Sequence, residues 1–210
     1  GMSAVRATGA AKLVMESGSV IEDAPSITRS KGDAGSVGPA GAVWLQGSDF
    51  EMENGAEIKN VNGRAVYADG GSVSVGGTIS GIIGNPAMWQ GKDGTAIHLR
   101  GENASAVLTS TAVIEEISGG GSAVFVTGSG NKLTTDPGSI IKDVANTTGI
   151  YCSFNSDAQL SGEITCVKNS IALSLNDSAA AVLKKEGIIC NNACTTAVVY
   201  LRAGAHFKVY

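Results

Sequence analysis

The sequence predicts an all-β solenoid of about seven to eight rungs, each built from three short strands. Three observations predict it: one apolar motif recurs along the chain, a second follows each copy of the first, and short alternating runs lie between them. The 210-residue chain also contains 29 glycines, and glycine permits the positive φ that tight corners between strands require.

The first strand of each rung is predicted from a four-residue motif with a small first residue and apolar second residue. It reads AVWL from Ala42 and AVYA from Ala65, and its copies recur at intervals of 23 to 31 residues. The second residues of the seven copies are Val43, Val66, Ile97, Val124, Ile150, Leu173 and Val198. The longer intervals indicate insertions into a shorter basic repeat.

The other two strands of each rung follow from weaker patterns. A motif of the form G-x-I-x-x-V predicts the third strand, with the isoleucines Ile21, Ile58, Ile79, Ile114, Ile141, Ile164 and Ile188. Between the motifs, apolar residues alternate with polar ones, as at Phe50 and Met52, which predicts the second strand. The segment AAAVLKKE from Ala179 has helix-forming composition, but its phase in the repeat predicts a strand.

Stacking explains why such short strands are stable. One rung cannot bury its own apolar face, whereas rungs about 4.8 Å apart join their inward residues into one continuous core. Neither the spacing of leucine-rich repeats nor the 3.6-residue periodicity of helical repeats is present.

These triplets of strands, with corners such as GTISG and GSIIKD, resemble the right-handed parallel β-helix, or pectin-lyase-like, repeats of bacterial surface and secreted proteins. The resemblance covers nearly the whole chain and implies a fold, a right-handed parallel β-helix, and not one function. That superfamily contains polysaccharide lyases and hydrolases as well as non-enzymatic, adhesin-like modules.

The composition of the chain argues against two classes of partner, nucleic acid and membrane. A net charge of −4 without a cluster of basic residues disfavours nucleic acid, and no apolar run of about 18 residues indicates membrane insertion. We expect one domain over residues 1–210, a segment of a larger protein, with insertions at 26–39 and 83–95. Since the last rung lacks a polar cap, a homo-oligomer or neighbouring domain is expected to cover the solenoid end.

An outward aromatic column is the main candidate site. If Val43 and Leu45 point inward, Trp44 points outward, and the same parity applies in every rung. The column then contains Trp44, Tyr67, His98, Phe125, Tyr151, Ser174 and Val199. The chain has only four Phe, four Tyr and two Trp, so this clustering suggests a shared role.

Three roles are open for the column: stacking on sugar rings, contact with another protein, and stabilisation of the solenoid by its ring ladder. A parallel column of small residues is expected to leave the ring faces accessible: Ala42, Ala65, Ala96, Ala123, Gly149, Ala172 and Ala197. Trp89, in the second insertion, is expected to extend the contact surface.

Catalytic groups of a carbohydrate-cleaving β-helix would lie in its outward polar columns. Asp69 and Arg100 are predicted rung neighbours in an outward column that also contains Gln46, Thr127, Ser153, Asn176 and Leu201. We favour a surface ion pair between them, because glycoside hydrolysis normally needs two carboxylates. The ligand-binding candidates are therefore Trp44, Tyr67, Trp89, His98, Phe125, Tyr151, Asp69 and Arg100.

A second polar column lies two residues after each repeated isoleucine: Asp23, Asn60, Gly81, Glu116, Asp143, Cys166 and Cys190. Glu116 and Asp143 would be one rung apart, as a carboxylate pair or a calcium site requires. However, Asp, Asn and Gly at one recurring position are typical of a turn with positive φ, which is the interpretation we favour.

Cysteine and histidine add no catalytic centre. Cys166 and Cys190, at matching rung positions, are close enough for a disulfide, and Cys190 could instead pair with Cys194. Free structural thiols are the favoured alternative, and Cys152 is expected in the core. His98 and His206 have no neighbouring nucleophile, and no cofactor or metal motif is present, so none is expected.

The sequence thus favours a non-enzymatic binding or adhesion module of a bacterial secreted or cell-surface protein, with a polysaccharide, glycan or another protein as partner. The alternatives are a polysaccharide-active lyase or glycoside hydrolase, using Asp69, Arg100 or the Glu116 and Asp143 pair, and a purely structural spacer.

Overall fold

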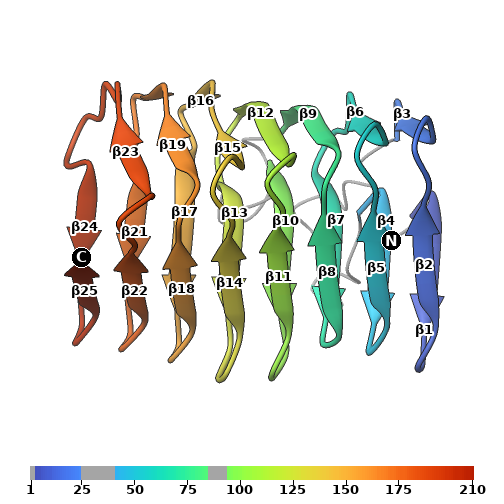
Figure 1. The fold of residues 1–210 in the computed structure, drawn as a ribbon, viewed down its shortest axis with the longest axis horizontal. Coiled ribbons are helices and arrows are strands. Elements are labelled where there is room, and N and C mark those ends of the chain that lie inside the picture. The colour runs from blue at the N-terminus through green and yellow to red at the C-terminus, as the bar shows by residue number, and fades with distance from the viewer. Residues whose placement is uncertain (1–2, 25–40, 85–93) are drawn as a thin grey trace, which may run out of the picture.

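The chain folds into a right-handed parallel β-helix, seen in a computed structural model that describes residues 3–24, 41–84 and 94–210. Figure 1 shows the rungs stacked side by side, from β1 at one end to β24 and β25 at the other. Every regular element among the described residues is a strand, and they form three parallel sheets of eight, eight and nine strands. The solenoid predicted from the repeats is confirmed.

The first sheet contains the seven strands predicted from the AVWL-type motif, preceded by β1, which the motif did not predict. Its strands are β1 (Val5–Thr8), β4 (Val43–Gln46), β7 (Arg64–Asp69), β10 (Thr95–Arg100), β13 (Ser122–Thr127), β17 (Thr148–Ser153), β21 (Leu173–Leu175) and β24 (Val199–Leu201).

The second sheet contains the alternating runs. They are β2 (Lys12–Met15), β5 (Asp49–Met52), β8 (Ser72–Val75), β11 (Ser105–Leu108), β14 (Lys132–Thr135), β18 (Asp157–Leu160), β22 (Ala180–Leu183) and β25 (His206–Val209). Strand β22 confirms that the segment from Ala179 is not helical.

The third sheet contains the isoleucine motifs: β3 (Val20–Glu22), β6 (Glu57–Lys59), β9 (Thr78–Ile83), β12 (Val113–Ser118), β15 (Ile140–Ile141), β19 (Glu163–Thr165) and β23 (Ile188–Cys190). Two short strands, β16 (Val144–Ala145) and β20 (Val167–Lys168), extend this sheet beyond the corner.

The core is built from columns of inward residues, one per rung. Val43, Val66, Ile97, Val124, Ile150 and Leu173 pair in register along the first sheet, and all are fully buried. Burial of these columns is the main stabilising contribution, at about 25 cal/mol per Å² of apolar surface.

Two corner lengths connect the second and third strands. Five residues separate Met52 from Ile58, whereas only three separate Val75 from Ile79. The short corner contains Gly76 and Gly77, and a Cβ on Gly77 would collide with the carbonyl oxygen of Ala56. Glycine is required there because another rung passes so closely.

The predicted register is wrong by one residue in the last strand of the first sheet, β24, and in the last strand of the third sheet, β23. Leu173 pairs with Val199 and not with Val198, and Ile164 pairs with Ile189 and not with Ile188. Two apolar residues are adjacent at both places, so the apolar pattern alone does not decide which of them points inward. Val198 and Ile188 are accordingly exposed.

The two predicted insertions fall mainly outside the described residues. Strand β9 continues to Ile83 and β10 begins at Thr95, so both ends of the second insertion belong to strands. Trp89, all of 26–39 and residues 85–93 of the second insertion lie outside the described part of the chain. No helix within the described residues is both long and apolar enough to cross a membrane.

Candidate binding face

The predicted aromatic column exists on the outward side of the first sheet. Strand pairing aligns Trp44 with Tyr67, Tyr67 with His98, His98 with Phe125, and Phe125 with Tyr151. After Ser174 the column ends in Tyr200, because of the one-residue shift in the last rung, and not in Val199 as predicted. At the other end, Arg6 pairs with Trp44.

Four of the side chains form a continuous ladder of ring contacts. The ring centroids of Tyr67 and His98 are 5.0 Å apart in an edge-to-face arrangement, and those of His98 and Phe125 are 4.7 Å apart and tilted. Phe125 and Tyr151 stack nearly parallel, at 4.8 Å and 6°. Each favourable ring pair contributes about 0.5–1.5 kcal/mol beyond burial of its area, so the ladder stabilises the rungs.

The middle of the ladder is buried, which corrects the expectation of open ring faces. Tyr67 is 2% exposed, and His98 and Phe125 are each 6% exposed. Only Trp44 and Tyr151, among the five predicted rings, are half-buried. Burial and neighbouring charges raise the pKa of the Tyr151 phenol, with burial the larger cause, so it remains a neutral hydrogen-bonding group.

The column of small residues is also buried. Ala42, Ala65, Ala96, Ala123 and Ala172 are at most 2% exposed and belong to the apolar core cluster. The expectation that they form an open border beside the rings is therefore wrong. Alternation predicts which way a side chain points from its strand, but does not predict what packs against it from outside.

Two arginines that the sequence analysis missed lie over rings of this face. The guanidinium carbon of Arg6 is 3.8 Å from the centroid of the Trp44 ring, and that of Arg64 is 5.2 Å from the centroid of Tyr67. Both are within the range of cation–π attraction. The sequence contained little signal for Arg6, because the first strand VRAT lacks the aromatic motif and Arg6 lies one residue further before β2 than Trp44 lies before β5.

A row of polar side chains runs beside the ladder, two residues further along each strand. Gln46, Asp69 and Arg100 pair along this row as predicted, and all three are exposed. Thr127 and Ser153 continue it, and their hydroxyls lie 3.3 Å apart.

Arg100 contacts the ladder and not Asp69. Its Nη1 donates to the Tyr67 hydroxyl at 3.5 Å, and this contact is the main cause of the raised pKa of Arg100, with a smaller contribution from Asp69. No ion pair within 4.0 Å joins Asp69 to Arg100, so the predicted pair is not formed. One carboxylate oxygen of Asp69 lies against Gly101.

The column of corner residues has the backbone conformation that a turn requires. Glu116, Asp143 and Cys166 have φ of 57°, 52° and 53°, and Gly81 has 62° in the same column. The last member is Asn191, at 51°, and not the predicted Cys190. The interpretation of this column as turn chemistry is confirmed.

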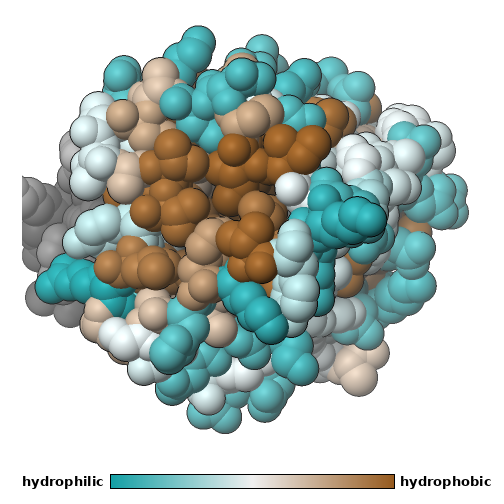
Figure 2. All heavy atoms as spheres, turned by 60° about the vertical axis from the view of Figure 1, so that its left-hand side comes forward, coloured by the Kyte–Doolittle hydropathy of each residue, from teal (hydrophilic) through white to brown (hydrophobic). Residues whose placement is uncertain are grey.

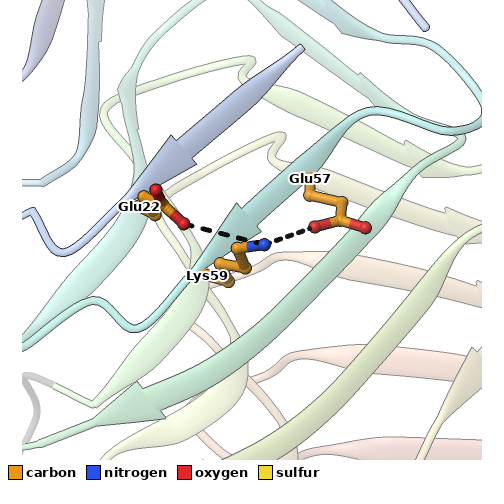
Figure 3. Close-up of polar contacts among 3 residues, drawn as sticks. All are labelled: Glu22, Glu57 and Lys59. Carbon is orange, nitrogen blue, oxygen red and sulfur yellow. Dashed lines mark hydrogen bonds and ion pairs between the residues drawn. The ribbon is translucent and has the colours of Figure 1, made fainter. Parts of the chain in front are cut away.

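Charged residues on the third sheet pair with one another, both within a strand and across rungs. Figure 3 shows Lys59 between two glutamates, with its Nζ 3.0 Å from Glu57 Oε2 and 3.7 Å from Glu22 Oε2. Lys142 likewise lies 2.9 Å from Glu115. These pairs are exposed or half-exposed, so each contributes little to stability.

All four cysteines are free. Cys190 pairs with Thr165 in the strand register, not with Cys166, because of the one-residue shift. Its Sγ lies 3.6 Å from Thr165 Oγ1 and 3.6 Å from Glu163 Oε1. Cys152 is in the core as predicted, and burial raises the pKa of its thiol to about 12, so it stays protonated.

The described residues contain no group of three or more His, Cys, Asp and Glu side chains that could hold a metal ion. Comparison with family models, with curated proteins and with solved structures finds no match to this chain. The chain is a parallel β-helix by its structure alone. Its function has to be argued from the face just described.

Proposed function

We propose that this protein is a non-enzymatic binding module of the kind found in bacterial adhesin-like and other pectin-lyase-like β-helices, acting outside the cell or on its surface. The outward face of the first sheet is its contact face, and its ligand is a glycan. The two half-buried rings of the column, Trp44 and Tyr151, supply the stacking surfaces.

The observation that carries this proposal is the combination of a ring ladder with a parallel row of hydrogen-bonding groups. Tyr151 lies at the end of the buried ladder, so its ring is held rigidly while part of it remains accessible. The row Gln46, Asp69 and Arg100 offers amide, carboxylate and guanidinium groups at strand spacing. Sugars present apolar ring faces and hydroxyl edges together, which matches such a pair of columns.

The burial of Tyr67, His98 and Phe125 assigns them a supporting role in this proposal. They fix the position of Tyr151 and, through the Tyr67 hydroxyl, the position of Arg100. The enzyme alternative has less support, because the turn conformation already accounts for Glu116 and Asp143.

Glycan-array binding of the purified chain tests the proposal. We expect Tyr151→Ala and Arg100→Ala each to weaken binding about tenfold, as loss of a contact worth about 1.4 kcal/mol would. Tyr210→Ala and Lys132→Ala are matched controls, because they remove an exposed ring and an exposed cation away from this face. Circular dichroism verifies that all variants fold.

Equal binding by wild type and all four variants would exclude the first sheet as the contact face. No binding by the wild type to any glycan would contradict the proposed ligand, leaving a protein contact or a structural spacer as the function.

A further inference from the structure

Apolar side chains are exposed at the C-terminal end of the solenoid. Leu201 is 47%, Val209 60% and Tyr210 65% exposed, and Ile188 and Val198 are also exposed. Figure 2, turned so that this end comes forward, shows a broad apolar area surrounded by hydrophilic residues. Within the described residues, no strand pairs with the outer edges of β24 and β25.

The opposite end shows a similar surface. Inward residues of the first rung, Val5, Leu13 and Ile21, are only half-buried, whereas their equivalents in the middle rungs are fully buried. Among the described strands, β1 and β2 each pair on one side only. Within the described residues, each end of the solenoid therefore presents unpaired strand edges around a partly exposed apolar interior.

The inward residues of the two ends are compatible with the stacking of one end on the other as consecutive rungs. If β1 of one copy followed β24 of another in the existing register, Val199 and Leu201 would lie against Val5 and Ala7. In the second sheet, Phe207 and Val209 would lie against Leu13 and Met15. Each inward position of the two strands is apolar at both ends, so the core would continue from copy to copy.

The aromatic column would also continue across the junction. Tyr200 ends the column at one end, and Arg6 ends it at the other, with its guanidinium over Trp44 at 3.8 Å. In the same register Arg6 would lie next to Tyr200 of the preceding copy. The cation would then lie between two rings, where cation–π attraction acts on both sides.

At the corner that follows the second sheet, the two ends of the solenoid carry opposite charges. At the C-terminal end this corner begins with Lys184 and Lys185, and Lys208 lies beside it in strand β25. The Nζ atoms of Lys184 and Lys208 lie 5.4 Å and 4.2 Å from the centroid of Tyr210. At the N-terminal end the same corner contains Glu16 and, one rung further, Glu53.

The net charge of each end has the same sign as the charge of its corner. Residues 184–210 contain four Lys and Arg and one Glu, whereas residues 3–24 contain two Lys and Arg and three Asp and Glu. Opposite ends therefore attract one another, while two C-terminal ends repel.

We propose that the C-terminal end of this solenoid binds the N-terminal end of a second copy of the same chain, so that the β-helix continues from one molecule into the next. The contact is made by the first two sheets. In the third sheet a step one strand wide remains, because β25 is the last described strand and β23 belongs to the preceding rung. Such a head-to-tail contact uses two different surfaces, so it builds open-ended chains and not closed dimers.

Sedimentation velocity of the purified chain over a range of concentrations, with electron microscopy of the same samples, tests this. We expect the average mass to rise continuously with concentration, without a plateau at two copies. A monomer at every concentration, or a closed dimer, would overturn the proposal.

Charge-reversal variants identify the surfaces. Lys185→Glu with Lys208→Glu makes the C-terminal end acidic around this corner, as the N-terminal end already is, and Glu16→Lys with Glu53→Lys makes both ends basic. Each double variant alone should associate at least about tenfold more weakly than wild type, because like charges would meet at the junction. All four side chains are exposed, so the fold should be retained.

Mixing the two double variants restores opposite charges at every junction, and we expect open-ended assembly to return. Lys132→Glu with Lys168→Glu is the matched control, since both lysines are exposed but lie in the middle rungs, and should associate as wild type does. Assembly limited to one copy of each variant, or no assembly of the mixture, would contradict the head-to-tail contact.

Discussion

At the scale of single residues, Glu116 shows how the fold tolerates a side chain that its backbone disfavours. Its φ of 57° lies in the left-handed region, which costs a residue with a Cβ about 1–2 kcal/mol. The rung above and the rung below have Asp143 and Gly81 in the same conformation. The corner geometry is therefore imposed by the stack, and the residue at each rung adapts to it.

Replacing Glu116 by glycine should stabilise the protein. Glycine adopts positive φ without strain, and we expect a gain of about 0.5–1 kcal/mol in the free energy of unfolding. Glu102→Gly should have the opposite sign, because Glu102 is equally exposed but has no positive φ. Urea unfolding of both variants measures this difference. Equal losses in both would mean that the corner is not strained.

At the scale of the rung, the repeat predicts a strand more securely than it predicts the strand's register. Where one apolar residue is flanked by polar ones, as Ile164 is, the inward position is unambiguous. Ile188 and Ile189 are adjacent, and only the pairing of Ile164 with Ile189 decides between them. A register that differs by one residue turns each side chain of a strand to the other face of the sheet. For this reason Tyr200, and not the predicted Val199, lies in the aromatic column.

The register of the last third-sheet strand can be tested directly. Ile189→Lys should lower the free energy of unfolding by about 2 kcal/mol, because Ile189 packs against the core cluster. Ile188→Lys should change it by less than about 0.5 kcal/mol, because Ile188 is 49% exposed. Thermal unfolding compares the two. A greater loss from Ile188→Lys would reverse the register.

The candidate site was only partly predictable from the sequence, because strand alternation determines the direction of a side chain but not its burial. Strand alternation correctly places Trp44, Tyr67, His98, Phe125 and Tyr151 in one column. Burial depends on packing from outside the sheet and on ring orientation, and neither has a period of two. The contact of Arg100 with Tyr67, in place of Asp69, likewise depends on side-chain conformations that the repeat does not encode.

At the scale of the whole molecule, a solenoid is nearly one-dimensional, because each rung contacts only its neighbours. The inner rungs have partners on both sides and fully buried inward residues, whereas the first and last rungs have half-exposed ones. Local opening should therefore be easiest at the two ends, and anything that covers an end should slow it.

Amide hydrogen exchange tests the head-to-tail junction without relying on a measurement of mass. At low concentration, amides of β1, β2, β24 and β25 should exchange fastest. As concentration rises, protection of these four strands should increase together, because one head-to-tail contact covers both ends. The step in the third sheet leaves β3 and β23 uncovered, so their exchange should change little. Protection that increased at one end alone would instead indicate pairing of like ends, in which the charge complementarity of the corner has no part.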